Sequence, residues 1–183
     1  GGIPQYLSLL KPGLSTAQLI DKECFSKNGF LYNEFTDLYR ALFDNADRYM
    51  KVIRALAAKP MGMTRNDIIK ASKLQTGGST TSLLEELSSS GFITPYVPFG
   101  RKIKDSIYIL TDEYSMFYLK FIEPNKASGK GAWLKISDTP LCKTWSGLAF
   151  ETVCYKHTPS INIALGIPGI YSEQSQWKKN NAT

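Results

Sequence analysis

The clearest amphipathic pattern of the chain begins near Asp44. Apolar residues then recur every three to four positions up to about residue 57, with basic residues between them, which predicts a helix with one buried face. Pro60 and Gly62 end this helix. Thr64 is a good N-cap for a second helix, because its side-chain oxygen can accept a hydrogen bond from a free backbone N–H of the first turn.

A third helix and an extended hairpin follow. A glycine pair forms the turn before the third helix, for which Ser79 is the predicted N-cap and Gly91 the end. An extended stretch then runs to a polar, basic tip at residues 100–105 and returns as an alternating apolar strand at 107–110. Three helices followed by a β-hairpin with a charged tip predict a winged helix-turn-helix.

The segments that flank this unit are helical and less complete. Pro4 suits the first turn of a short helix, and Ser15 with Gln18 forms the sequence pattern of a capping box. On the carboxy-terminal side, a helix is predicted across 147–156, with Leu148, Val153 and Cys154 as candidate inner positions.

The predicted fold class is therefore mainly α with a small β-hairpin, an α+β chain. Residues 124–132, rich in Asn, Lys, Ser and Gly, have the composition of a flexible connection and are the best domain boundary. We expect a helical lid end at 1–43, the winged helix-turn-helix at 44–123, the linker at 124–132 and the start of a truncated domain at 133–183.

Composition and charge limit the classes of protein to consider. The 183 residues are 43% hydrophobic and 21% charged, which is typical of a globular chain, and no apolar run approaches the length of a membrane helix. We expect a cytoplasmic protein without membrane contact. The 22 Lys and Arg against 16 Asp and Glu give a formal charge of +6, which permits binding to nucleic acid or to an acidic partner.

Catalytic and metal-binding patterns are weak. Cys24, Cys142 and Cys154 form no CxxC pair, so reduced, buried thiols are expected. His157 is the only histidine and has no Cys or Asp at a spacing that indicates a triad. The hydroxyl cluster that begins at Ser79 is explained at least in part by helix capping. The sequence predicts no catalytic residue and no metal site.

Several stretches, taken in order, resemble one family. They are GGIPQYL at the start, LFDNADRYMKVIRALA, the stretch GFITPYVPFGRKIKDSIYILTDEYSMFYLKFI, the pattern W-x-G-x-x-F-E from Trp145 to Glu151, and ALGI further on. Together they resemble the carboxy-terminal region of the archaeal-type AAA ATPases, relatives of the signal-transduction ATPases with numerous domains. The likeness covers nearly the whole chain.

The resemblance implies a larger protein that binds ATP or ADP, with this chain as a regulatory part that contacts the ATPase core. The chain lacks the phosphate-binding loop, so we expect it to bind no nucleotide alone and to hydrolyse none. Gly2, Ile3 and Pro4 look like the glycine-x-proline element that approaches the adenine and ribose. The alternative interpretation is a simple helix start.

The resemblance further implies that residues from Trp145 begin a domain similar to restriction-endonuclease-like nucleases. Glu151 would then be a candidate acidic residue on its first helix. A single carboxylate makes no two-metal site, however, and a solvated helix glutamate is the alternative interpretation.

The remaining question is whether the predicted winged helix binds DNA. The cations placed to reach phosphates are Arg101, Lys102 and Lys104 at the hairpin tip, with Arg65, Lys70 and Lys73 on or beside the second helix.

The third helix contains no Lys or Arg and carries Glu85 and Glu86, which disfavours readout of base edges. The leading hypothesis is a regulatory ATPase module with weak, unspecific binding to the DNA phosphate backbone. A DNA-binding transcriptional regulator is the alternative, and a nuclease fragment is a third possibility.

Overall fold

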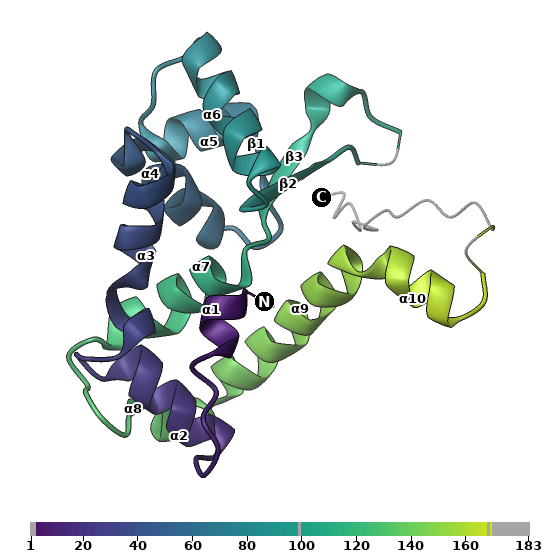
Figure 1. Cartoon of the computed structure of the whole chain (residues 1–183). Coiled ribbons are helices and arrows are strands. Elements are labelled where there is room, and N and C mark those ends of the chain that lie inside the picture. The colour runs from purple at the N-terminus through teal and green to yellow at the C-terminus, as the bar shows by residue number, and fades with distance from the viewer. Residues whose placement is uncertain (1–2, 99, 168, 170–183) are drawn as a thin grey trace.

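The computed structural model describes residues 3–98, 100–167 and 169, without the side chain of Tyr155. Within them the chain is mainly helical with one small antiparallel sheet, so the α+β prediction is confirmed. Most helices form one body, from which a hairpin and the last two helices extend (Figure 1). No described helix is long and apolar enough to cross a membrane.

The α-helices are α1 (Pro4–Leu7), α2 (Thr16–Ile20), α3 (Phe30–Leu42), α4 (Ala46–Ala57), α5 (Arg65–Ser72), α6 (Gly78–Ser89), α7 (Glu113–Phe117), α8 (Ala132–Ile136), α9 (Pro140–Lys156) and α10 (Thr158–Ala164). The strands are β1 (Met63–Thr64), β2 (Ile93–Tyr96) and β3 (Ile107–Leu110). Short π-helical or 3₁₀ turns are η1 (Asp21–Phe25), η2 (Ile103–Asp105), η3 (Tyr118–Ile122) and η4 (Glu123–Asn125).

Local helix signals of the sequence are confirmed at three starts. Pro4 is the first residue of α1. The hydroxyl of Ser15 accepts from the backbone N–H of Gln18 at 3.3 Å, while the Gln18 side chain accepts from the N–H of Ser15 at 2.8 Å. Thr64 caps α5 in the predicted way, since its Oγ1 accepts from the backbone N–H of Asp67. These caps satisfy N–H groups that have no partner within the helix.

The predicted cap of α6 is wrong. The helix begins at Gly78 with Gly77 at the N-cap position, where φ is 153°, and no side chain caps it. Ser79 lies in the first turn, and its Oγ instead accepts a hydrogen bond from the guanidinium of Arg48 on α4 at 3.0 Å. Ser79 therefore bonds to Arg48 of another helix and does not cap its own helix. The other end is as predicted, because Gly91 follows α6 with φ 76°.

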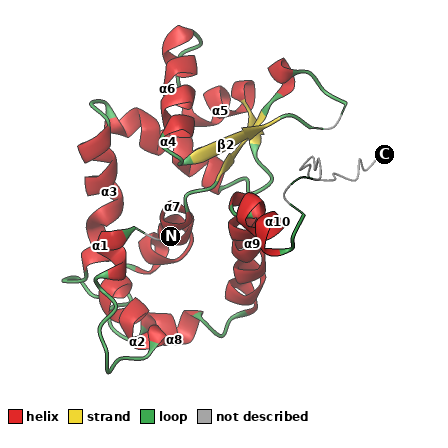
Figure 2. Cartoon of the chain, turned by 45° about the vertical axis from the view of Figure 1, so that its right-hand side comes forward, coloured by secondary structure: helices red, strands yellow, loops and turns green. Residues whose placement is uncertain are grey.

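The three strands form one sheet in the order β1-β3-β2, and both pairings are antiparallel. The predicted hairpin is thus present, and β1, which was not predicted, extends its sheet beside α5 and α6 (Figure 2). Gly62 allows this approach, since a Cβ there would lie 2.7 Å from the backbone oxygen of Tyr108. Two-residue strands such as β1 carry too short an alternation to be recognised in sequence.

The centre of the body is aromatic and is organised by α3, which lies in the predicted helical segment 1–43 but was not predicted as a separate helix. Phe35 and Tyr39 on α3 are fully buried. The Phe35 ring stacks on Tyr118 with centroids 4.6 Å apart, and the Tyr39 hydroxyl lies 2.9 Å from the hydroxyl of buried Ser115. Tyr118 and Phe121, both on η3, belong to the same core.

The predicted linker lies against the body. The Asp21 carboxylate, which is 8% exposed, accepts from the backbone N–H of Gly131 at 2.7 Å and of Trp133 at 3.0 Å. Trp133 then packs against Phe25 and Phe121. Residues on both sides of 124–132 therefore share one hydrophobic core. The domain boundary at 124–132 stays a prediction.

The last long helix differs from its prediction. α9 begins at Pro140 rather than near residue 147, and its first half is the part that enters the core, through buried Cys142 and half-buried Trp145. Two of the predicted inner positions, Leu148 and Val153, are exposed, while Cys154 is half-buried. Only one side of this part of the helix meets the body, so apolar character alone did not mark the buried positions.

Candidate nucleic-acid interface

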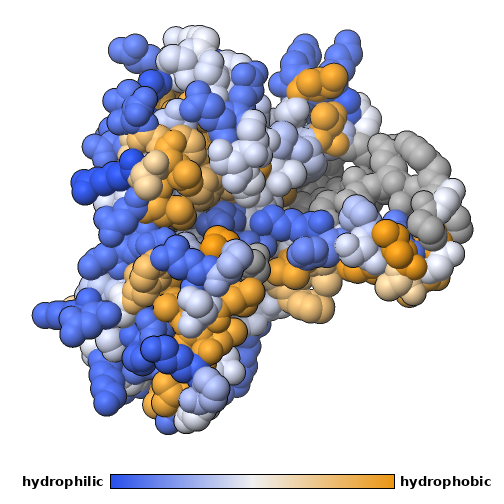
Figure 3. Space-filling view, in the orientation of Figure 1, coloured by the Kyte–Doolittle hydropathy of each residue, from blue (hydrophilic) through white to orange (hydrophobic). Residues whose placement is uncertain are grey.

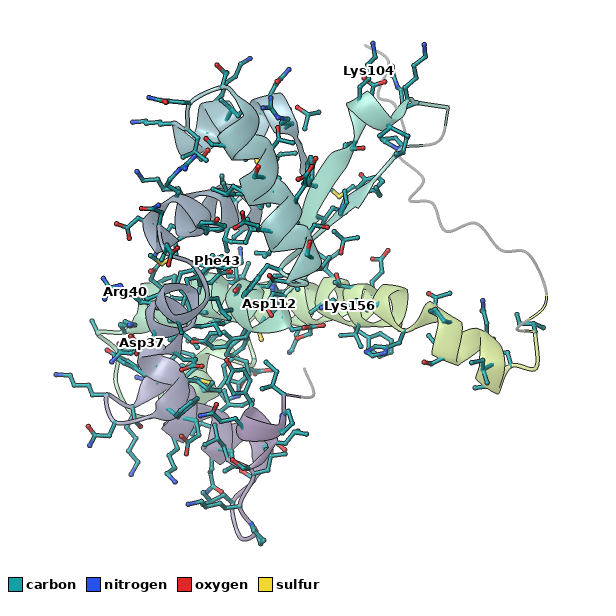
Figure 4. The ribbon with its side chains drawn as sticks, turned by 45° about the horizontal axis from the view of Figure 1, so that its top comes forward. Asp37, Arg40, Phe43, Lys104, Asp112 and Lys156 are labelled. Carbon is teal, nitrogen blue, oxygen red and sulfur yellow. The ribbon has the colours of Figure 1, made fainter. Side chains whose placement is uncertain are left out.

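The end of the β2–β3 hairpin carries the predicted cluster of cations. Arg101, Lys102 and Lys104 are all exposed, and none of them forms an ion pair with another described residue. A short turn holds them in place, since the Asp105 carboxylate accepts from the backbone N–H of Lys102 at 3.3 Å. Lys104 lies at the far end of the hairpin from Asp112, where the hairpin joins α7 (Figure 4). The cluster is thus held by backbone contacts and faces solvent.

One apolar residue sits among these cations. Ile103, between Lys102 and Lys104, is 84% exposed, and it belongs to the single turn η2. A single exposed apolar side chain is common on protein surfaces, and a partner that covered Ile103 would gain free energy from its burial. Sequence analysis missed this residue, although its position between two lysines at a hairpin tip is a visible signal.

The second predicted group of cations lies around α5. The Arg65 guanidinium donates to the backbone oxygen of Gly77 at 3.0 Å, so it braces the turn between α5 and α6. Lys73 is exposed and ends α5 in the left-handed conformation, with φ 55°. Lys70 is exposed and lines a shallow hollow of about 530 Å³ together with Lys59 and Asp67. Of the three predicted cations here, Arg65 donates a hydrogen bond within the fold, whereas the side chains of Lys70 and Lys73 form no ion pair with another described residue.

The outward face of α6 is polar and carries no cation. Glu85 and Glu86 are exposed, and the Tyr49 hydroxyl on α4 donates to the Glu86 carboxylate. Burial and the charge of Glu86 raise the pKa of Tyr49 to about 12, so the phenol keeps its proton at neutral pH and remains a donor. Arg48 on α4 and Arg65 on α5 donate hydrogen bonds at the start of the helix, to Ser79 and to Gly77 respectively. The composition of this face does not provide the Arg, Lys, Asn or Gln that read base edges.

The element compared with an adenine-binding glycine-x-proline lies beside α7 (Figure 1). Gly2 falls outside the described residues, Ile3 is exposed, and Pro4 opens α1. Two residues on, the Tyr6 hydroxyl donates to Glu34 at 3.1 Å, and its ring lies 5.7 Å from that of Tyr114. Burial of Tyr6 and the adjacent Glu34 raise the pKa of Tyr6 above its usual range. The start of the chain is thus anchored on α3 and α7.

The other candidate residues are not brought together. Glu151 and His157 are exposed on or next to α9, and no group of three His, Cys, Asp or Glu side chains in the described ranges could hold a metal ion. Cys24 and Cys142 are buried and Cys154 is half-buried, all as free thiols. Burial raises the pKa of the Cys24 thiol to about 12, which leaves it protonated and unreactive at neutral pH.

Comparison with known proteins gives one relative. No protein-family model matches the chain, and no solved structure matches it. An uncharacterized protein of Methanocaldococcus jannaschii is 25% identical over an alignment of 182 positions that covers 96% of this chain. The same stretch is 40% of the relative, so the chain spans about two fifths of the length of that protein.

Proposed function

We propose that this chain is the non-catalytic, winged-helix regulatory part of a larger AAA-type ATP-binding protein. We further propose that it binds the phosphate backbone of duplex DNA, weakly and without sequence preference, through the β2–β3 hairpin. The observation that carries the proposal is the exposed cluster of Arg101, Lys102 and Lys104 at the end of that hairpin, without ion pairs in the described chain.

The order of elements supports the winged-helix part of the proposal. A helix, a short strand, two helices and a hairpin follow one another from α4 to β3, and the short strand β1 joins the sheet of the hairpin. In helix-turn-helix proteins the second helix of the pair, here α6, is the one that enters the major groove. Because α6 presents Glu85 and Glu86 and no cation, we expect the contribution of base contacts to be small.

The contact with an ATPase core rests on the resemblance and on the anchored start of the chain. Tyr6 fixes α1 on Glu34 and Tyr114, while Ile3 beside it remains exposed. A segment held from one side and exposed on the other is available to a neighbouring unit of the same protein. ATP or ADP would be bound by that unit, and not by this chain, which has no phosphate-binding loop.

The DNA part is tested by replacing Arg101, Lys102 and Lys104 with Ala together. Affinity for unrelated duplexes should fall about equally, and the plot of log affinity against log salt should become shallower by up to about 0.9 for each lost phosphate contact. The free energy of unfolding should change little, because the three residues are exposed. An unchanged salt slope would contradict DNA binding by the hairpin.

Ile103 separates DNA binding from docking on protein. A contact limited to phosphates does not use its side chain, so Ile103→Ser should leave DNA affinity unchanged. A hairpin that docks on the ATPase core would use this side chain, and Ile103→Ser should then alter ATP turnover in the full-length protein. In that case neither Ile103→Ser nor the triple alanine variant should change DNA affinity. This pair of variants assigns the hairpin to one kind of partner.

The alternative function, a DNA-binding transcriptional regulator, differs in its specificity. A regulator should protect one defined sequence at physiological salt, whereas phosphate contacts alone should protect none. A footprinting assay on genomic fragments distinguishes the two. The purified chain should also show no ATP turnover, and turnover that persists through repurification would contradict the non-catalytic assignment.

A further inference from the structure

The part of the chain from Leu148 to Ile167, which we call the arm, exposes a long series of large apolar side chains. The arm comprises the second half of α9 and the whole of α10. Its exposed apolar residues are Leu148, Phe150, Val153, Ile161, Ile163, Leu165 and Ile167. Hydrophobic surface is visible along α9 and at α10 in the space-filling view (Figure 3). Soluble proteins rarely leave so many large apolar groups in water on adjoining helices.

These side chains lie on opposite sides of the arm. Successive residues of an α-helix are rotated by about 100°, so two residues that are two positions apart point about 200° apart. Leu148 and Phe150 are such a pair and are 50% and 70% exposed. Ile161 and Ile163 on α10 are a second pair. A partner with one flat contact surface would cover one side and leave the other in water.

The arm is also poor in charge. From Leu148 to Ile167 the sequence contains only Glu151 and Lys156 as Lys, Arg, Asp or Glu. A solvated surface carries such residues at roughly 25–35% of its positions. A helix that is apolar on several sides and sparsely charged is the pattern of a helix buried inside a folded unit.

The root of the arm belongs to the body already described. In the first half of α9, Cys142 is buried, and Trp145 packs edge-on against Phe121 with centroids 5.0 Å apart. Farther along, Lys156 pairs with Glu113 on α7, with 3.0 Å between Nζ and Oε1. The inner side of α9 is therefore fixed, and the arm is held in place with its outer sides uncovered by described residues.

The M. jannaschii relative indicates what can cover such an arm. Nearly all of this chain matches a stretch that is 40% of that protein. The polypeptide in which this stretch occurs there is thus long enough to contain another folded unit. A unit of the same polypeptide can close around both sides of a helix, whereas a second copy of a rigid chain meets it from one side.

We infer that α9 is shared between two folded units, with its first half in the core of the described body and the arm in the core of a further unit of the same, longer polypeptide. The arm then supplies apolar side chains to that core from two opposite sides. This inference goes beyond the proposed function, because it requires neither nucleotide nor DNA and would hold if the hairpin bound neither.

Cys154 provides the test, since it lies on the arm and is the one half-buried cysteine, while Cys24 and Cys142 are buried. Labelling with a maleimide is compared between this chain and the full reading frame that contains it, both at dilute, monomeric concentration. We expect Cys154 to react at least tenfold more slowly in the full-length protein, with Cys24 and Cys142 slow in both. A reading frame that ends at Thr183, or equal rates, would overturn the inference.

Two variants test whether the arm is surrounded. In the full-length protein, Leu148→Lys and Phe150→Lys should each restore fast labelling of Cys154, because each places a charge in the shared core from a different side. Leu42→Lys, at an exposed position of α3, is the matched control and should change nothing. Restoration by only one of the two arm variants would contradict enclosure and indicate a one-sided contact.

A second copy of the chain is the competing occupant. It would protect Cys154 in the 183-residue chain alone, and the protection would rise with protein concentration in step with dimer formation in sedimentation experiments. That result would overturn the inference. Concentration-independent, fast labelling of the short chain together with slow labelling of the full-length protein is the outcome that supports it.

Discussion

The hairpin and the arm both extend from the body, and they meet water in opposite ways. The hairpin ends in Arg101, Lys102 and Lys104, whose charges are well hydrated, so their exposure to water is not unfavourable. Near its end the arm carries Ile163 and Leu165, each 66% exposed. Exposure of the first group needs no partner, and exposure of the second is unfavourable until a partner covers it.

This difference determines what each extension can bind. Lys and Arg attract phosphates electrostatically, and salt weakens this attraction. A contact between the hairpin and phosphates is therefore reversible and depends on the salt concentration. Apolar side chains on two sides of a helix gain free energy only when they are enclosed, so an arm contact is part of folding. We therefore propose a transient partner for the hairpin and a permanent place in the architecture of the protein for the arm.

The comparison depends first on Asp21, which fixes Gly131 and Trp133, in the segment that leads to the root of the arm, to the body. Asp21→Ala should lower the free energy of unfolding by about 2–4 kcal/mol, because hydrogen bonds to a charged acceptor contribute about 1.5–3 kcal/mol each and two backbone N–H groups, those of Gly131 and Trp133, lose theirs. Urea denaturation measures the loss. Hydrogen exchange should become faster in α8 and α9 before it changes in β2 and β3.

Asp21→Asn is the matched variant, since it keeps one carbonyl acceptor and should lose about half as much stability. A change within about 0.5 kcal/mol in Asp21→Ala would show that the root of the arm does not depend on this carboxylate. Equal acceleration of exchange in the hairpin and in α9 would remove the distinction between the two regions.

The hairpin side of the molecule was largely predictable from sequence, and the arm side was not. Thr64 and Gly91 act through neighbours within a few residues, so the start of α5 and the end of α6 are determined locally. The link from Asp21 to Trp133 spans 112 positions, and no local pattern announces it. The same holds for Arg48, whose contact with Ser79 displaced the predicted cap of α6.

The residues of the candidate site also differ in whether the local sequence predicts their role. Exposure of Arg101, Lys102 and Lys104 followed from a turn-rich tip between two strands. The bracing role of Arg65 could not be predicted, because it depends on where the turn at Gly77 lies in three dimensions. Leu148 and Val153 were predicted as inner positions and are exposed, because an apolar residue on a helix is buried only if another element lies over it.

Lys73 tests whether the α5–α6 turn extends the basic surface of the hairpin. Its left-handed conformation, with φ 55°, is unfavourable by about 1 kcal/mol for a residue with a Cβ, so Lys73→Gly should raise the free energy of unfolding by up to about 1 kcal/mol. If Lys73 contacts a phosphate, the same variant should make the salt dependence of DNA affinity shallower by about 0.9.

Lys70→Gly is its control, because Lys70 lies in the last turn of α5 and should lose about 1 kcal/mol on the same change. Denaturation and binding titrations on both variants separate charge from conformation. A Lys73→Gly variant that gains stability and keeps the full salt slope would confine the basic surface to the hairpin.

Glu85 tests how closely α6 approaches DNA when the hairpin is bound. A unit charge about 10 Å from a phosphate in water contributes about 0.4 kcal/mol, so Glu85→Gln should strengthen binding about twofold if α6 faces the duplex. Glu151→Gln on the arm removes the same charge from a different surface and should have a smaller effect. Equal effects of the two variants in a titration at low salt would show that α6 is not part of the interface.

The smallest expected effect concerns the arm in the 183-residue chain. Phe150 is 70% exposed, so Phe150→Ala removes few contacts with the body, and alanine is the better helix former. The free energy of unfolding should stay within about 0.5 kcal/mol of the parent. Phe121→Ala, at a position that is 1% exposed, should instead lose about 3–5 kcal/mol, because it leaves a cavity in the aromatic core.

In the longer polypeptide, if Phe150 enters the core of a further unit, Phe150→Ala should lose nearly as much stability as Phe121→Ala. Urea denaturation of both variants in both lengths gives the four values. A Phe150→Ala variant that is as harmless in the longer protein as in the short chain would mean that the arm, like the hairpin, remains in water.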